Sequence, residues 1–288
     1  MTKPGLIVGH SGRRQSGFTL AEMVIAIIIL GIVSAVVSVF LRAPVDAYFD
    51  VSRRAQLTDV ADTALRRIAR DLQRAIPNSV RVAGGCSGAV ACYLEYVPVV
   101  AGGRYRAELD QLGAGDTLDF SDNTDTSFDA IGPGISVPAP PLSLVVYNLG
   151  IPGADVYSGA GGANDIRRSG VSVAANTVSF TSAVALPFES PSRRFHIASQ
   201  PVTYFCSPAP APVGGTLVRH TGYGFLAAQP TPPGGVSSLL AMQVTSCSFS
   251  YSSLEVARSA GLISLSIQIT HEGETISLFQ QVHVPNVP

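Results

Sequence analysis

One acidic residue, Glu22, lies inside the long apolar run at residues 18–41, FTLAEMVIAIIILGIVSAVVSVFL. An ionised carboxylate near the centre of a membrane helix costs about 2.5–3.5 kcal/mol on insertion scales, and less near the membrane interface. Two explanations remain open at this point. The side chain reaches the interface and is solvated there, or it is neutralised by a buried cationic partner.

Other residues that could do chemistry give weaker signals. The acidic segment 119–129 (DFSDNTDTSFD) offers Asp122, Asn123 and Asp125 as calcium ligands, but it lacks EF-hand spacing, which favours a solvated loop. His271-Glu272 starts like a zinc-protease motif and lacks the second histidine. The histidines are scattered at His10, His196, His220, His271 and His283. A Ser–His–Asp site assembled only in three dimensions stays open, but we expect no enzymatic activity, cofactor or metal.

Composition excludes several classes of protein. The 288 residues carry 19 basic and 20 acidic side chains, and this balance offers no positive excess for nucleic acid. Charged residues make up 14% of the chain, against roughly 25% in ordinary soluble domains. The hydrophobic fraction of 46% excludes bulk disorder. We therefore expect a folded protein that is not a nucleic-acid binder.

The run at residues 18–41 is long enough to cross a membrane. As a helix it spans about 36 Å, against a hydrocarbon core of roughly 30 Å. Secretory signals have shorter apolar regions of about 7–15 residues. Lys3, Arg13 and Arg14 precede the run, and no basic residue follows until Arg42. This asymmetry predicts a single-pass membrane protein with residues 1–17 in the cytoplasm and the rest exported.

The junction RRQSGFTLAE at residues 13–22, followed by the apolar run, resembles type IV prepilins and the pseudopilins of type II secretion. The resemblance implies cleavage between Gly17 and Phe18 by a prepilin peptidase, and N-methylation of the new amino group on Phe18. It also implies that Glu22 meets the N-terminal amine of a neighbouring subunit and sets the register between subunits. The resemblance further implies that the membrane is the inner membrane and that the exported part lies in the periplasm. Partners would be the peptidase/methyltransferase, the inner membrane, and other major and minor pilins through the N-terminal helix.

Patches beyond the helix resemble minor pilins of the mannose-sensitive haemagglutinin (MSHA) pilus. They lie at residues 71–82, 93–106, 115–120 and 195–206. This resemblance implies a non-enzymatic subunit that assembles or primes a pilus and then lies in the fibre or at its tip. A J-type pseudopilin of type II secretion is the first alternative. A membrane-anchored periplasmic enzyme or binding module is the second, and it predicts an uncleaved first residue and a deep pocket with converging polar groups.

The element pattern predicts an α+β fold, in which one long helix packs on an antiparallel β-rich head. Residues 57–76 show apolar side chains three and four apart, with Pro77 expected to end the helix and Gly31 and Pro44 to kink it. Expected strands are 92–100, 117–120, 142–149, 177–181, 195–206, 216–225, 240–251, 262–271 and 275–284. Glu272-Gly273-Glu274 reads as a hairpin turn, and 151–170, 207–215 and 226–237 read as loops. The expected divisions are a cleaved leader (1–17), a transmembrane half-helix (18–41), an amphipathic half-helix (42–76) and the head (77–288).

Four cysteines, Cys86, Cys92, Cys206 and Cys247, allow three disulfide connectivities. Export to an oxidising compartment favours disulfides over free thiols. We expect Cys86–Cys92 as a local clip and Cys206–Cys247 as a link between strands, the longer loop stabilising more. The alternative, a zinc site made from all four thiolates, is disfavoured because no pair has the C-x2–4-C spacing.

Overall fold

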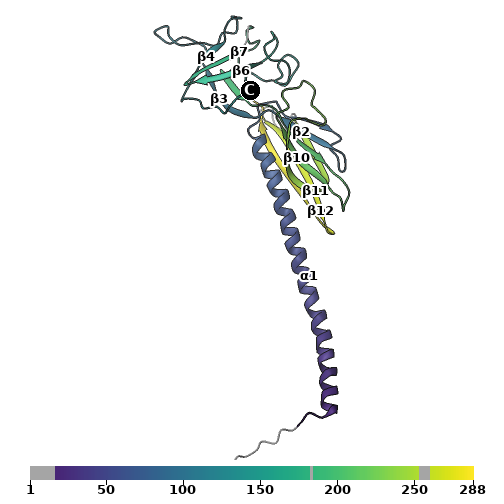
Figure 1. Ribbon diagram of the computed structural model, residues 1–288. Helices are drawn as coiled ribbons and strands as arrows, with labels where there is room; N and C mark the ends of the chain where they lie inside the picture. The colour runs from purple at the N-terminus through teal and green to yellow at the C-terminus, as the bar shows by residue number, and fades with distance from the viewer. Residues whose placement is uncertain (1–16, 182–183, 253–259) are drawn as a thin grey trace, which may run out of the picture. The chain divides into compact units, whose positions relative to one another are not determined.

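The computed structural model describes residues 17–181, 184–252 and 260–288, so most of the expected leader lies outside the described residues. The fold is α+β, as expected. It contains helix α1 (Leu20–Leu72) followed by strands β1 (Arg81–Gly84), β2 (Cys92–Tyr96), β3 (Val99–Tyr105), β4 (Ser127–Ile131), β5 (Ser143–Val145), β6 (Arg167–Ala174), β7 (Thr177–Thr181), β8 (Arg194–Ala198), β9 (Val202–Ser207), β10 (Gly215–Thr221), β11 (Val236–Ser252), β12 (Ala260–His271) and β13 (Glu274–Pro285) (Figure 1). Contacts divide the chain into two compact units, residues 1–52 and 53–288.

Helix α1 ends at Leu72, earlier than the expected stop at Pro77. Beyond Leu72 the backbone turns toward the segment that precedes β3. Ile76 N–H donates to the Val97 carbonyl at 2.8 Å, and Val99 N–H donates to the Arg74 carbonyl at 2.8 Å. The helix therefore stops because its next backbone groups are used in β-type hydrogen bonds. Pro44 lies inside α1 without ending it.

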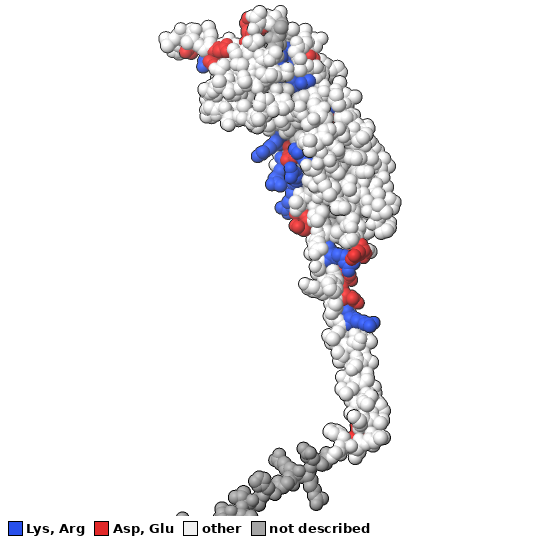
Figure 2. Space-filling model, in the orientation of Figure 1, with Lys and Arg blue, Asp and Glu red and all other residues white. Residues whose placement is uncertain are grey.

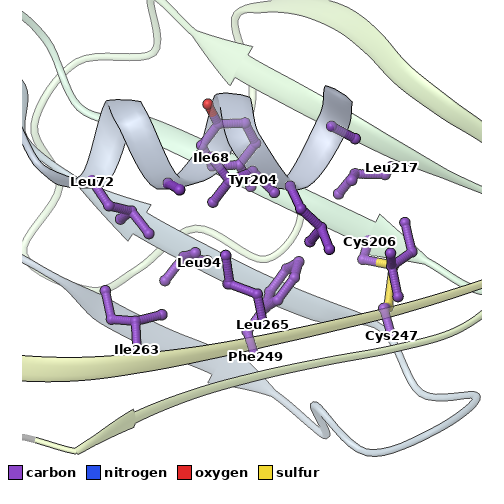
Figure 3. Close-up of a cluster of buried hydrophobic side chains, with 14 of the residues drawn as sticks. Ile68, Leu72, Leu94, Tyr204, Cys206, Leu217, Cys247, Phe249, Ile263 and Leu265 are labelled. Atoms are coloured by element: carbon purple, nitrogen blue, oxygen red, sulfur yellow. A yellow bond between two sulfur atoms is a disulfide. The ribbon is translucent and has the colours of Figure 1, made fainter. Parts of the chain in front are cut away.

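The C-terminal part of α1, residues 53–72, packs on a seven-stranded antiparallel sheet of order β1-β2-β9-β10-β11-β12-β13. In Figure 3, Ile68 and Leu72 from the helix lie over Leu94, Tyr204 and Leu265 from the strands. This confirms that the apolar stripe packs on a sheet. Val60 is an exception, since 40% of it stays exposed.

The remaining strands close a barrel of order β3-β4-β7-β6-β5-β8. Its interior is aromatic. Phe128 packs edge-on against Phe195 with ring centroids 4.9 Å apart, and Tyr105 is also buried there. A third cluster, which includes Ile76 after the helix and Val145 of β5, joins the barrel to the end of α1. The head thus has one hydrophobic core between the helix and the sheet and a second inside the barrel, and the third cluster connects the barrel to the end of α1.

Two predictions, each of one continuous strand, were wrong in the same way. Each of the ranges 92–100 and 195–206 contains two strands, one in the sheet and one in the barrel. The chain leaves the sheet near Pro98 and returns near Pro201. A proline cannot donate to a β ladder, so it suits a point where the chain changes partners.

Other strand boundaries also differ from expectation. Strands β1 and β4 were not expected, and residues 117–120 form no strand. β6 begins inside the expected loop 151–170, and β11 begins inside the expected loop 226–237. These segments have weak apolar alternation, and it is their strand partners that make them extended. The hairpin turn at Glu272-Gly273 is confirmed, with His271 opposite Glu274.

Candidate functional site

The start of α1 forms a capping box. Glu22 N–H donates to Thr19 Oγ1 at 3.3 Å. In return, the N–H and the hydroxyl of Thr19 both donate to Glu22 Oε2 at 3.4 Å. Thr-x-x-Glu is the spacing in which the first and fourth residues satisfy each other's backbone donors. The sequence indicated Glu22 as a functional residue, but the role of Thr19 in orienting its carboxylate was not predicted.

Glu22 has no cationic partner in the described part of the chain. Its carboxylate is exposed, and its contacts are those to Thr19. A glutamate in the first turn also interacts favourably with the positive end of the helix dipole. The cap and the dipole orient the charge but do not neutralise it, so the carboxylate remains available for an external amine or guanidinium.

The helix beyond Glu22 is apolar on every side. Residues 20–41 are all exposed in the structure, and Glu22 is the sole ionisable residue among them. On the face that Figure 2 shows, this stretch is uncharged apart from a red acidic spot near its start. Helix α1 is long and apolar enough to cross a membrane. A helix that is hydrophobic all round belongs in a membrane or in a protein core, and here the protein itself buries none of it.

The expected cleavage site is open. Phe18 is 85% exposed, and no atom lies within 4 Å of a Cβ placed on Gly17. The protein's own structure therefore has no steric need for glycine at position 17. Any requirement for glycine at this position would come from an enzyme that binds the chain around Gly17 and Phe18.

The structure pairs the cysteines as Cys86–Cys92 and Cys206–Cys247. The first bridge closes the loop between β1 and β2. The second joins β9 to the part of β11 that extends beyond Gly215, the first residue of β10. Cys92 and Cys206 lie opposite each other on neighbouring strands, both fully buried. Disulfide formation leaves no thiolate for the zinc alternative.

In the acidic segment 119–129, Asp119 and Asp122 use their carboxylates within the segment, whereas Asp129 of β4 accepts hydrogen bonds from Asp116 and Thr177. Asp119 Oδ1 accepts from the Ser121 N–H at 2.7 Å, and Asp122 Oδ1 accepts from the Thr124 N–H at 2.7 Å. The hydroxyls of Ser121 and Thr124 donate to the same two oxygens, and these hydroxyl bonds, followed by the backbone ones, lower the pKa of both aspartates. Within the described ranges, no three Asp, Glu, His or Cys side chains gather as a metal site.

The described histidines lie apart from one another, and His10 falls outside the described residues. His271 contacts Gln243, and His220 contacts the Gly234 carbonyl. Burial, with a smaller contribution from the Arg194 charge, lowers the pKa of His196 to about 4. His283 is exposed. No hydrogen bond seen at these described histidines joins an imidazole to a serine or an aspartate.

A polar cluster that sequence reasoning missed fixes the end of α1 to the sheet. Asp71 Oδ2 accepts hydrogen bonds from Tyr204 Oη at 2.6 Å, Tyr96 Oη at 3.0 Å and Arg219 Nε at 3.3 Å. Burial raises the pKa of both tyrosines well above the usual range, so they remain protonated donors. No local pattern could reveal it, because the four residues come from α1, β2, β9 and β10.

An open cavity of about 550 Å³ lies beside this cluster. Its walls include Asp71, Tyr96, Arg219 and Gln200. Polar side chains line it, as the enzyme or binding-module alternative requires of a pocket. The Asp71 oxygen that could act as a base is already the acceptor of three hydrogen bonds, which fits a structural role.

Residues 12–38 match the family model of the prokaryotic N-terminal methylation motif. No curated protein and no solved structure matches the chain. The motif supports a pilin-like protein, either type IV pilin or pseudopilin, with a membrane-anchoring helix. It implies processing by a prepilin peptidase and assembly with other pilins, and it indicates a structural subunit rather than an enzyme.

Proposed function

We propose that the chain is a minor type IV pilin of the MSHA type, similar to the pilus biogenesis protein MshO, and that it assembles or primes a pilus without catalysing a reaction. Residues 1–17 are the cytoplasmic leader, α1 crosses the inner membrane, and the head lies in the periplasm before the subunit enters the fibre or its tip. The length of the chain and its large β-rich head support a minor rather than a major subunit.

The observation that carries the proposal is the state of Glu22. Its carboxylate is oriented by Thr19 and has no cation beside it among the residues from Gly17 onward that the structure describes, in a helix that is otherwise apolar through residue 41. An unpaired charge in hydrocarbon is costly, while a charge paired in good geometry is much less so. Cleavage before Phe18 would create a positive amine at the same membrane depth. Such an amine on a neighbouring subunit would supply the missing partner.

The leader junction provides the test. Because Gly17 is exposed and no described atom beyond its chain neighbours lies within 4 Å of a Cβ placed on it, Gly17→Val should leave the folded head unchanged. We expect wild-type chain from its native cells to begin with N-methylated Phe18, and Gly17→Val chain to begin with Met1 and stay out of sheared fibres. Mass spectrometry of the mature N-terminus reads both outcomes.

Two results would contradict the proposal. Wild-type protein that still begins with Met1 would favour the membrane-anchored enzyme or binding module. Wild-type protein that is cleaved and methylated, but found with secretion components rather than with pili, would favour the pseudopilin of type II secretion.

A further inference from the structure

Strand β13 forms a long edge of the seven-stranded sheet. It pairs with β12 through twelve consecutive residue pairs, from Glu274 opposite His271 to Pro285 opposite Ala260, without a register shift. It is the last strand in the sheet order, and no other described strand pairs with its far side. The edge is therefore straight and regular over its whole length.

The hairpin turn decides which backbone groups face outward. Glu272 and Gly273 both have positive φ, at 47° and 84°, so they form a two-residue turn closed by His271 and Glu274. In an antiparallel ladder, alternate residues then direct their N–H and C=O away from the partner strand. On β13 these outward residues are Thr275, Ser277, Phe279, Gln281 and His283. All of them are exposed.

This edge lacks the usual protection. Proteins commonly shield an open edge with charges, prolines, bulges or a very short strand. Residues 275–282, TISLFQQV, contain no charge, proline or glycine. Such an uncharged segment of high β-propensity is an aggregation hazard when it stays open.

The other edges of the head are protected. β1, the opposite edge of the sheet, is four residues long, ends at Gly84 and leads into the Cys86–Cys92 clip. The barrel strands close on themselves. The contrast indicates that β13 is kept open for a partner.

We propose that β13 is the acceptor edge for an extended strand of another, different pilin-type subunit, which adds an eighth strand to the sheet. The inference rests on the proposed function, because assembly supplies such a subunit. An outward row of N–H and C=O groups is satisfied by another extended backbone. The partner strand carries uncharged side chains, because the exposed face it would continue consists of hydroxyl and amide groups around Phe279, which is 65% exposed and lies opposite Ser266.

A second copy of the chain fits this edge poorly. Antiparallel pairing of β13 with its own copy would run the two helical segments 53–72 in opposite directions, whereas subunits drawn from one membrane run in the same direction. Parallel pairing would place the two helical segments on opposite faces of the joined sheet, whereas subunits of the proposed fibre pack their helices together. Pairing of β13 with β1 of another copy would use four residues of a twelve-residue edge.

Proline substitution separates the outer edge from the hairpin. The N–H groups of Ser277 and Gln281 point away from β12, so a Ser277→Pro/Gln281→Pro double variant keeps the β12–β13 ladder and removes two outward donors. The matched control, Ser277→Ala/Gln281→Ala, changes the same side chains and keeps both N–H groups. Thermal unfolding and the two disulfides report folding of the full-length variants.

We expect the proline variant to fold, and its amount in sheared fibres to be lower than that of wild type by a factor of about ten or greater. The reason is that two strand-pairing hydrogen bonds are lost. The alanine control should enter normally. Equal incorporation of the folded proline variant would overturn the proposal. So would a dimer of purified chain that the proline changes dissociate, because it would assign the edge to a second copy.

If the proline variant fails to fold, amide hydrogen exchange along β13 of the wild-type chain tests the proposal instead. The amides of the outward residues should exchange about 100-fold slower or more in fibres than in purified chain, as new pairing protects them. Unchanged exchange would overturn strand addition. Processed chain in fibres with an unprotected β13 would leave the proposed function standing. Chain that keeps Met1 and yet protects β13 would instead overturn the proposed function alone.

Discussion

Glu22 has one observed role, as a cap, and one proposed role, in subunit pairing, and two conservative substitutions can distinguish these roles. Its carboxylate caps the first turn of α1 through Thr19. Under the proposed function, the same carboxylate also offers a negative charge to a neighbouring subunit. Glutamine at this position of a capping box still accepts a hydrogen bond from the cap residue. Glu22→Gln therefore keeps the cap and removes the charge, whereas Thr19→Ala weakens the cap and keeps the charge.

The expected sizes of the two effects differ. Loss of an N-cap side chain costs about 1 kcal/mol, which is roughly a fivefold change in an equilibrium. Leaving one charge of a buried pair without its partner costs about 3–5 kcal/mol, which is more than about 100-fold. In an assembled bundle, Glu22→Gln would leave the neighbour's amine unpaired. We therefore expect Glu22→Gln to enter fibres more than about 100-fold less than wild type, and Thr19→Ala at most about fivefold less.

The assay compares the amount of each variant in the membrane fraction with that in sheared fibres by quantitative immunoblot. Membrane insertion should persist in both variants, because the apolar run is unchanged. Mass spectrometry of the N-terminus confirms that each variant is processed. Normal fibre entry of Glu22→Gln, together with a defect in Thr19→Ala, would refute the charge argument and assign the role of Glu22 to capping.

The head offers two further predictions. Replacing both cysteines of the Cys206–Cys247 bridge by serine should lower the free energy of unfolding by about 4 kcal/mol, against about 2 kcal/mol for the Cys86–Cys92 bridge, because the bridges span 41 and 6 residues. Urea unfolding measures both, and equal losses would contradict the loop-length argument. His196 has a folded pKa of about 4, below its ordinary 6.5, so the unfolded state binds the extra proton between these pH values. The contribution of neutral His196 to the free energy of unfolding should be fully present above pH 6.5. The free energy of unfolding should fall by up to about 3 kcal/mol as the pH drops toward 4. His196→Gln should lack this part of the pH dependence, and an unchanged difference between pH 7 and pH 4.5 would show that His196 does not cause it.

Local pattern was enough for the helix as far as Leu72 and for the motif at its start, but not for the end of the helix, which tertiary hydrogen bonds decide. The apolar run, the acid at position 22 and the stripe at residues 57–76 are spaced by the helix repeat itself, so each is readable over a few turns of chain. The turn at Glu272-Gly273 was also readable, because glycine two residues from the end of an alternating run favours a tight hairpin. The pairs Cys86–Cys92 and Cys206–Cys247 expected from sequence are those the structure contains.

Tertiary structure decided the rest, because strand pairing joins residues that are far apart in sequence. The segment 92–105 looks continuous as a sequence, yet β2 pairs with β9 in the sheet and β3 pairs with β8 in the barrel. Asp71 gathers its three donors from β2, β9 and β10 only once the helix lies on the sheet. The open edge of β13 likewise depends on the order in which seven strands meet, and no single segment encodes that order.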